Sequence, residues 1–132
     1  MLIQRDIKTS SREEIIDITS EVQKVIRESN IESGICLIYV PHTTCAITIN
    51  ENADPDVKRD ILYWLNKHVP QNDNFRHAEG NSDAHIKTLM SGQSVELIID
   101  ASKPVLGTWQ GIYFCEFDGP RKRRFLIKII SG

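Results

Sequence analysis

This sequence of 132 residues has no long apolar run, no paired-cysteine motif and no excess of positive charge. Without an apolar run of about 20 residues, it contains no candidate membrane-spanning helix. Its charged first residues, MLIQRDIK, do not resemble a secretory signal peptide. The formal net charge of -2 argues against a general nucleic-acid binder, which needs an excess of cations across one face. We therefore expect a protein that binds neither membranes nor nucleic acids.

The three cysteines, Cys36, Cys45 and Cys115, are odd in number and have no CxxC spacing. Each lies in an apolar run typical of a strand, where a free cysteine packs as a small hydrophobe. We interpret all three as structural. Free thiols of this kind indicate a reducing, cytoplasmic setting.

No linker, repeat or low-complexity segment divides the chain, so we expect residues 1–132 to form a single domain. Strand patterns outnumber helical ones, and the helices intervene singly, which indicates an α+β fold with a two-layer β core. The expected strands cover residues 3–8, 34–40, 45–51, 95–100, 111–117 and 124–130. The expected helices cover residues 54–68 and 82–90.

The segment after the first strand allows two interpretations. Its apolar residues recur with helical spacing, and Ser11 with Glu14 could form a capping box at the start of one long helix. Its β-branched residues instead allow a second strand over 13–17, followed by a helix from about Thr19 to Asn30.

Three of the expected strands are apolar on both faces, namely residues 34–40, 45–51 and 111–117. An antiparallel sheet in a small domain usually has one polar face. A second sheet or another subunit should therefore cover the outer face, and we take this pattern to indicate an oligomer.

Two histidines, His77 and His85, frame the segment RHAEGNSDAH. The glycine between them could turn the chain back and bring the two imidazoles together. Such a pair can bind zinc, with His42 at a strand end or the carboxylate of Glu116 as a third ligand. The alternative is that both histidines are loop and helix-start residues that hydrogen-bond the backbone.

The segment 118–124, with the sequence DGPRKRR, gathers four cations after a turn. If the last strand alternates regularly, Arg121 and Arg123 lie on the face that points toward the core. Guanidinium groups in such a position need carboxylate or phosphate partners. Because Glu116 and Asp118 are nearby carboxylates, the segment predicts either an ion-pair network or a phosphate site.

Four further residues could contact a ligand. Trp109 and Gln110 follow a glycine that predicts a turn; the indole could stack on a planar heterocycle, and the amide could pair with a ring nitrogen. A single Trp is more commonly a core residue. Asn50 and Glu51 end an apolar strand just before a helix start, where polar groups often meet ligands.

Several motifs, in this order along nearly the whole chain, resemble the YjbQ-like family, which is named for a secondary thiamine-phosphate synthase activity. They are His42-Thr43-Thr44, Ile49-Asn50-Glu51-Asn52, Asp60, His77 with Gly80-Asn81 and Ala84-His85, Gly107-Thr108-Trp109-Gln110, and Glu116-Phe117-Asp118-Gly119-Pro120-Arg121. The chain departs from the family at Lys103-Pro104, where a glycine and then a leucine are usual. Its substrate preference is therefore expected to differ.

The resemblance implies an α+β domain with a β-sandwich that assembles as a homotrimer, and it favours the short strand followed by a helix after the first strand. It also implies weak condensation of a hydroxymethylpyrimidine diphosphate with a thiazole phosphate, which releases pyrophosphate. The partner would accordingly be a small phosphorylated molecule.

On this basis we expect a thiamine-phosphate synthase-like transferase. The residues expected to be catalytic are His42, His77, His85 and Glu116, and the three histidines are also the expected ligands of a divalent metal, Zn or Mg. The residues expected to bind substrate are Thr43, Asn50, Glu51, Asn81, Thr108, Trp109, Gln110, Asp118, Arg121 and Arg123. Two alternatives are a zinc hydrolase with Glu51 or Glu116 as base, and a non-catalytic trimeric protein that binds phosphate or a pyrimidine.

Overall fold

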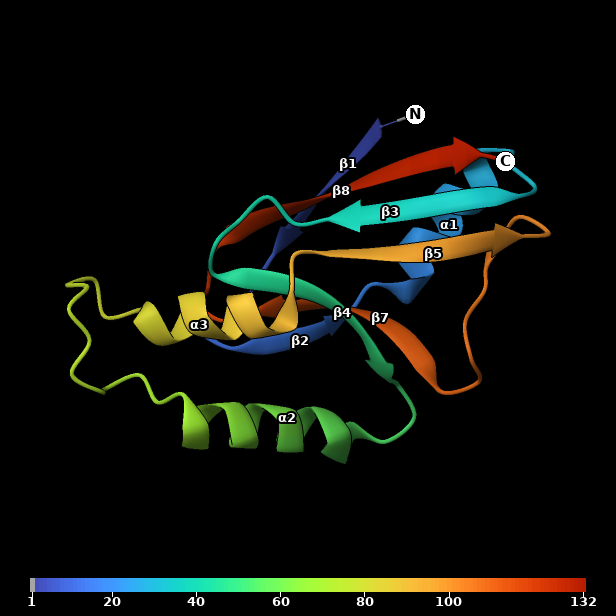
Figure 1. Ribbon diagram of the computed structural model, residues 1–132. Coiled ribbons are helices and arrows are strands. Elements are labelled where there is room, and N and C mark those ends of the chain that lie inside the picture. Colours follow the sequence, from blue (N-terminus) through green and yellow to red (C-terminus); the bar gives the residue numbers. More distant parts are fainter. Residues whose placement is uncertain (1) are drawn as a thin grey trace.

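A computed structural model describes residues 2–132, which form two antiparallel sheets and three helices (Figure 1). One sheet has five strands in the order β1-β8-β3-β5-β6, and the other has three in the order β2-β7-β4. The strands are β1 (Leu2–Lys8), β2 (Glu14–Asp17), β3 (Gly34–Tyr39), β4 (Cys45–Glu51), β5 (Ser94–Asp100), β6 (Lys103–Pro104), β7 (Gln110–Glu116) and β8 (Lys122–Ser131). The helices are α1 (Thr19–Glu28), α2 (Pro55–His68) and α3 (Ser82–Ser91).

The main core lies between the two sheets. Alternate residues of β8 point inward, among them Phe125, Ile127 and Ile129, and they meet Ile112 and Phe114 of β7. Helix α1 adds its apolar face to the same cluster. The α+β fold with a two-layer sheet core is therefore as predicted.

A second, smaller core lies on the other face of the three-stranded sheet. There Tyr113, Cys115 and Phe117 pack with Leu65 of α2 and Ala84 of α3. Figure 1 shows α2 and α3 on the side of this sheet that faces away from the five-stranded sheet. Strand β7 is thus buried on both faces, as its uninterrupted apolar sequence predicts.

The ambiguous segment after β1 forms a strand and then a helix, so the single long helix is wrong. Strand β2 pairs with β7 in the register Ile16 opposite Phe114, and α1 begins only at Thr19. Ser11 and Glu14 do not cap a helix, although the Ser11 hydroxyl lies 3.4 Å from the Glu14 carboxylate. Tertiary pairing with β7 prevails over the helical spacing of the apolar residues.

The helix that follows β4 begins as its sequence predicts. The side chain of Asp54 accepts a hydrogen bond of 2.9 Å from the backbone N–H of Asp56, and Pro55 occupies the first helical position. The two-residue strand β6 (Lys103–Pro104) is not predicted, because so short a segment carries no periodic signal. No helix within residues 2–132 is long and apolar enough to cross a membrane.

Candidate functional site

A buried ion pair lies at the end of β7 and the start of β8. Arg123 donates from Nε to Glu116 Oε1 at 2.9 Å and from Nη2 to Glu116 Oε2 at 2.6 Å. Its Nη2 also lies 2.7 Å from the hydroxyl of Thr44. The prediction that Arg123 points toward the core and meets a carboxylate is confirmed.

Glu116 is held almost entirely by donors. Besides Arg123, it accepts from the hydroxyl of Thr9 at 2.7 Å and from the backbone N–H of Asp118 at 3.1 Å. Burial alone would raise the pKa of Glu116, but the bonds from Arg123, Thr9 and Asp118 outweigh it and hold that pKa below the ordinary value. A carboxylate so stabilised in its charged form suits an anchor better than a general base.

A glycine makes this close packing feasible. A Cβ at Gly119 would lie 2.8 Å from the side chains of both Glu116 and Thr9, and it would also strike the carbonyl oxygen of Ser11. Any larger residue there would push the β7–β8 turn away from the ion pair.

A second polar group lies nearer the surface. Asn81, just before α3, donates from Nδ2 to Asp118 Oδ2 at 2.8 Å, and Arg121 reaches the same oxygen at 3.0 Å. Arg121 is exposed, in contrast to the inward position predicted for it, because the turn interrupts the strand alternation. The amide oxygen of Asn81 is buried and has no hydrogen-bond partner within residues 2–132.

The two predicted histidines of the loop and α3 do come together. The imidazole centroids of His77 and His85 lie 5.7 Å apart in an edge-to-face arrangement. The Glu79 carboxylate lies 3.9 Å from His77 Nε2. Within residues 2–132, however, no three His, Cys, Asp or Glu side chains are grouped so that they could hold a metal ion. The residues therefore supply a two-histidine pair and not a three-ligand site.

His42 lies apart from His77 and His85, beside the start of β8 in the five-stranded sheet. This residue follows the end of β3. Its Nε2 accepts a hydrogen bond of 3.0 Å from the backbone N–H of Arg124 in β8. Partial burial, followed by the nearby charges of Arg123 and Arg124, lowers the pKa of His42 below its ordinary value. The neutral ring therefore carries its proton on Nδ1 and can donate that proton as a hydrogen bond.

Around His42 the chain forms a cationic recess of about 660 Å³. It is lined by Asp6, Ile7, Lys8, His42, Lys122, Arg123 and Arg124. The β1–β8 register places Lys8 directly opposite Lys122. Like charges in such a pair repel each other, and within residues 2–132 neither lysine forms an ion pair. Lys122 belongs to the four cations of the segment DGPRKRR, but its position opposite Lys8 depends on the pairing of β1 with β8, which is not visible in the sequence.

The other predicted binding residues lie at the opposite end of the three-stranded sheet. In the β4–β7 register, Glu116 pairs with Cys45, whereas Gln110 pairs with Glu51 six residues further along. At the usual rise per residue this separates Gln110 from Glu116 by about 20 Å. The residues at this far end are Asn50, Glu51, Thr108, Trp109 and Gln110.

Hydrogen bonds hold the turn at this far end rigid. The side chain of Gln110 accepts from the backbone N–H of Gly107 at 2.7 Å, and Trp109 accepts from the N–H of Asn52 at 2.8 Å. The indole of Trp109 is 63% exposed. Thr43 is also exposed, in the loop before β4.

A buried charge network that the sequence analysis missed lies under α3. Lys87 is fully buried, and its ammonium donates to Asp83 at 2.8 Å, Asn66 at 2.7 Å and Glu13 at 3.1 Å. Arg12 holds the other side of Asp83 with two bonds of 3.0 and 3.2 Å. Only the spacing of Asp83 and Lys87, four residues apart on a helix, hinted at this pair. The network ties α2, α3 and the start of β2 together.

Comparison with known proteins gives consistent matches along the chain. A family model described as UPF0047 protein YjbQ-like matches residues 3–132. The UPF0047 protein MJ1081 of Methanocaldococcus jannaschii is 58% identical and covers 99% of this chain and 95% of its own. The UPF0047 protein YugU of Bacillus subtilis is 53% identical, and the match covers 99% of this chain and 100% of YugU.

Solved structures agree with these matches. A crystal structure of an uncharacterised yjbq/upf0047 protein from Clostridium acetobutylicum is 53% identical, with a TM-score of 0.95 over 97% of this chain and 99% of that one. The crystal structure of a protein of unknown function from Sulfolobus solfataricus has the same TM-score at 31% identity. The match covers 100% of this chain and 97% of that one. The similarity thus extends over the whole fold.

Proposed function

The chain belongs to the YjbQ-like UPF0047 family, and on that premise we propose that it binds a small phosphorylated molecule in the recess around His42. One observation carries this proposal. Lys8 and Lys122 stand directly opposite each other, and within residues 2–132 neither forms an ion pair, so an anion between them would relieve their mutual repulsion. A phosphate or diphosphate would relieve that repulsion.

The other groups of the recess suit the same ligand. Arg123 uses Nε and Nη2 for Glu116 and Thr44, which leaves Nη1 for a ligand. Because Glu116 already balances the charge of Arg123, the attraction for an anion comes chiefly from Lys8, Lys122 and Arg124, which outnumber the one carboxylate of the recess, Asp6. Neutral His42 would add a hydrogen bond from Nδ1.

We further propose that the reaction is the thiamine-phosphate synthase-like condensation suggested by the family resemblance. In it, a thiazole nitrogen forms a bond to the pyrimidine methylene carbon as the carbon–oxygen bond to diphosphate breaks. The protein supplies no nucleophile; the recess stabilises the departing diphosphate. A reducing, cytoplasmic setting fits the three buried free thiols.

A homotrimer is the third part of the proposal. The row Ile130, Ile35 and Ile98 runs across β8, β3 and β5 on the outer face of the five-stranded sheet, with 55%, 50% and 65% exposure. A neighbouring copy would cover this row. A second copy would also be needed for Trp109 to contact a ligand bound in the recess. Within one chain, Trp109 and the Glu116–Arg123 pair beside the recess lie at opposite ends of β7.

The hydrolase alternative draws support only from the His77–His85 pair. A metal bound there would need a third ligand from a second copy or from the substrate. The geometry of the recess therefore favours binding and transfer of a phosphorylated group over metal-dependent hydrolysis.

Titration calorimetry with inorganic pyrophosphate tests the binding proposal. We expect saturable binding that weakens by about tenfold in Lys122→Gln, the size of one lost charged hydrogen bond. Lys128→Gln is the matched control, since Lys128 lies on the same exposed face of β8 but outside the recess. Equal effects of both substitutions, or no binding by the wild type, would contradict the proposal. Pyrophosphate release from the two phosphorylated substrates then tests transfer separately.

A further inference from the structure

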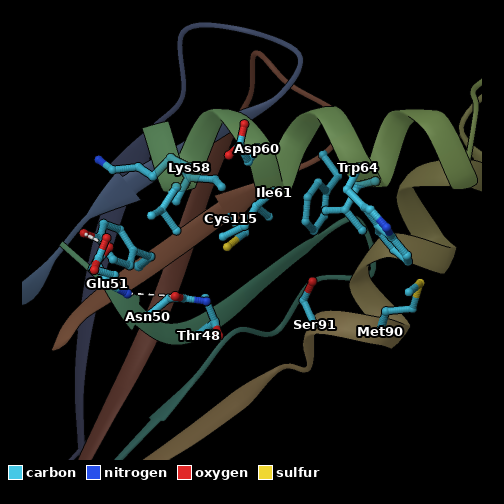
Figure 2. Close-up of a pocket in the computed structure, with 15 residues that line it drawn as sticks. Thr48, Asn50, Glu51, Lys58, Asp60, Ile61, Trp64, Met90, Ser91 and Cys115 are labelled. Atoms are coloured by element: carbon cyan, nitrogen blue, oxygen red, sulfur yellow. Dashed lines mark hydrogen bonds between the residues drawn. The ribbon is translucent and has the colours of Figure 1, made fainter. Parts of the chain in front are cut away.

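Helix α2 does not close onto the sheet that it faces. Its apolar stripe includes Val57, Ile61 and Trp64, yet Leu65 is the only buried residue of this helix. The space between the helix and the sheet is a cleft of about 590 Å³ (Figure 2). Protein interiors are normally packed without voids of this size, and ligand clefts commonly have about 300–1,000 Å³.

The walls of the cleft are mainly aromatic and apolar. Tyr113 and Cys115 of β7 form one side, and Ile61 and Trp64 of α2 form the other. Met90, at the end of α3, lies near Trp64 across the mouth of the cleft (Figure 2). Such walls suit a flat apolar body, which can stack between side chains.

Several polar groups of the cleft have no hydrogen-bond partner among the described residues 2–132. Within residues 2–132, the Glu51 carboxylate and the hydroxyls of Thr48 and Ser91 take part in no hydrogen bond, although all three residues line the cleft. Asn50 uses its carbonyl oxygen for the N–H of Glu51, so its Nδ2 is free. A few unpaired polar groups within apolar walls are typical of a ligand site.

The charges of the cleft favour a donor or a cation over an anion. Glu51 and Asp60 contribute two carboxylates, whereas the single ammonium, that of Lys58, lies 5.0 Å from the centroid of the Tyr113 ring. The cleft is thus net negative, in contrast to the recess around His42. The same ligand group would not suit both.

We propose that this cleft binds a small planar aromatic molecule that carries an amino or amidinium group. The ring would lie against Ile61 and Trp64 of α2, and the donor group would face Glu51. The proposal rests on the cleft alone and is independent of phosphate binding in the recess.

Benzamidine is the probe, because it combines a flat ring with an amidinium group. Trp64 is half-exposed at the cleft and the chain has only two tryptophans, so Trp109→Phe leaves Trp64 as the sole indole reporter. In this background we expect a saturable change in emission with benzamidine. Benzoate, the anion of similar shape, should bind about two- to fivefold more weakly, the size of a partly exposed charge interaction.

Glu51→Gln tests the proposed polar contact and Glu32→Gln is its control, because Glu32 is an exposed acid outside the cleft. We expect benzamidine to bind about two- to fivefold more weakly in the Glu51 variant and with unchanged affinity in the control. Three results would overturn the proposal: no saturable change, equal affinity for benzoate, or equal effects of the two substitutions. A fourth result would also overturn it: Trp64 emission that benzamidine changes only after an oligomer has been dissociated. That result would identify the cleft as an interface between copies of the chain.

Discussion

Replacing Lys87 by Met removes a buried charge while keeping most of the side-chain volume. Lys87 and Asp83 are both fully buried, and three acceptors surround the ammonium. Among the described residues, the substitution leaves Asp83 with Arg12 as its only cationic partner and Glu13 with the amide of Asn66. Its main energetic effect is therefore an incompletely paired charge and not a cavity.

Breaking a buried ion pair by removing one partner costs about 3–5 kcal/mol. Because Arg12 still holds Asp83 with two hydrogen bonds, we expect the lower end, about 3 kcal/mol, which is a large share of the 5–15 kcal/mol typical of whole domains. For a chain of this length that loss corresponds to a fall in Tm of roughly 10 °C.

Urea unfolding, followed by circular dichroism at a fixed protein concentration, measures this loss. Lys67→Met is the control, since Lys67 is exposed on α2, and it should change the free energy of unfolding by less than about 0.5 kcal/mol. In the double variant with Asp83→Asn the two losses should not add, because both act on one network. A loss below about 1 kcal/mol in Lys87→Met would refute the view that the network stabilises the fold.

Two further predictions concern acid stability and assembly. The pKa of Glu116 is lowered in the fold, so its contribution is present above the unfolded-chain pKa of 4.5 and is lost as the pH falls through the lower folded-state value. Glu116→Gln should therefore flatten the fall in unfolding free energy below pH 4.5 in acid titrations; an unchanged slope would contradict the assignment. Light scattering should give about three times the 15.1 kDa mass of one chain, reduced in Ile98→Lys but not in Glu96→Lys, which alters the adjacent outward position of β5.

The sequence predicted most of the fold because the strongest signals are local. The capped start of α2 and the continuous apolar run of β7 depend on residues close together in the chain. The strand β2 could not be settled in the same way. Whether this segment is helical or extended depends on its pairing with β7, a contact between residues about 100 positions apart in the sequence.

The candidate site was less predictable for a related reason. The pairing of Arg123 with Glu116 followed from strand alternation across one turn. The opposition of Lys8 and Lys122, in contrast, depends on which strands are neighbours, and the burial of Lys87 depends on how α2 and α3 sit on the sheet. The predicted strand 111–117 already implies that Trp109 and Glu116 stand at opposite ends of β7, as the structure shows.

The position of β8 bears on how quickly the molecule can fold. This strand pairs with β1 on one side and β3 on the other, so Leu2 meets Lys128 from the far part of the chain. Until β8 arrives, β1 has no partner and the five-stranded sheet is interrupted. To form such distant pairings, the chain must lose conformational entropy before the new contacts stabilise it. The topology therefore places this domain with the slow-folding β proteins, and the inward-facing apolar residues of β8 stay exposed to other chains until that strand pairs.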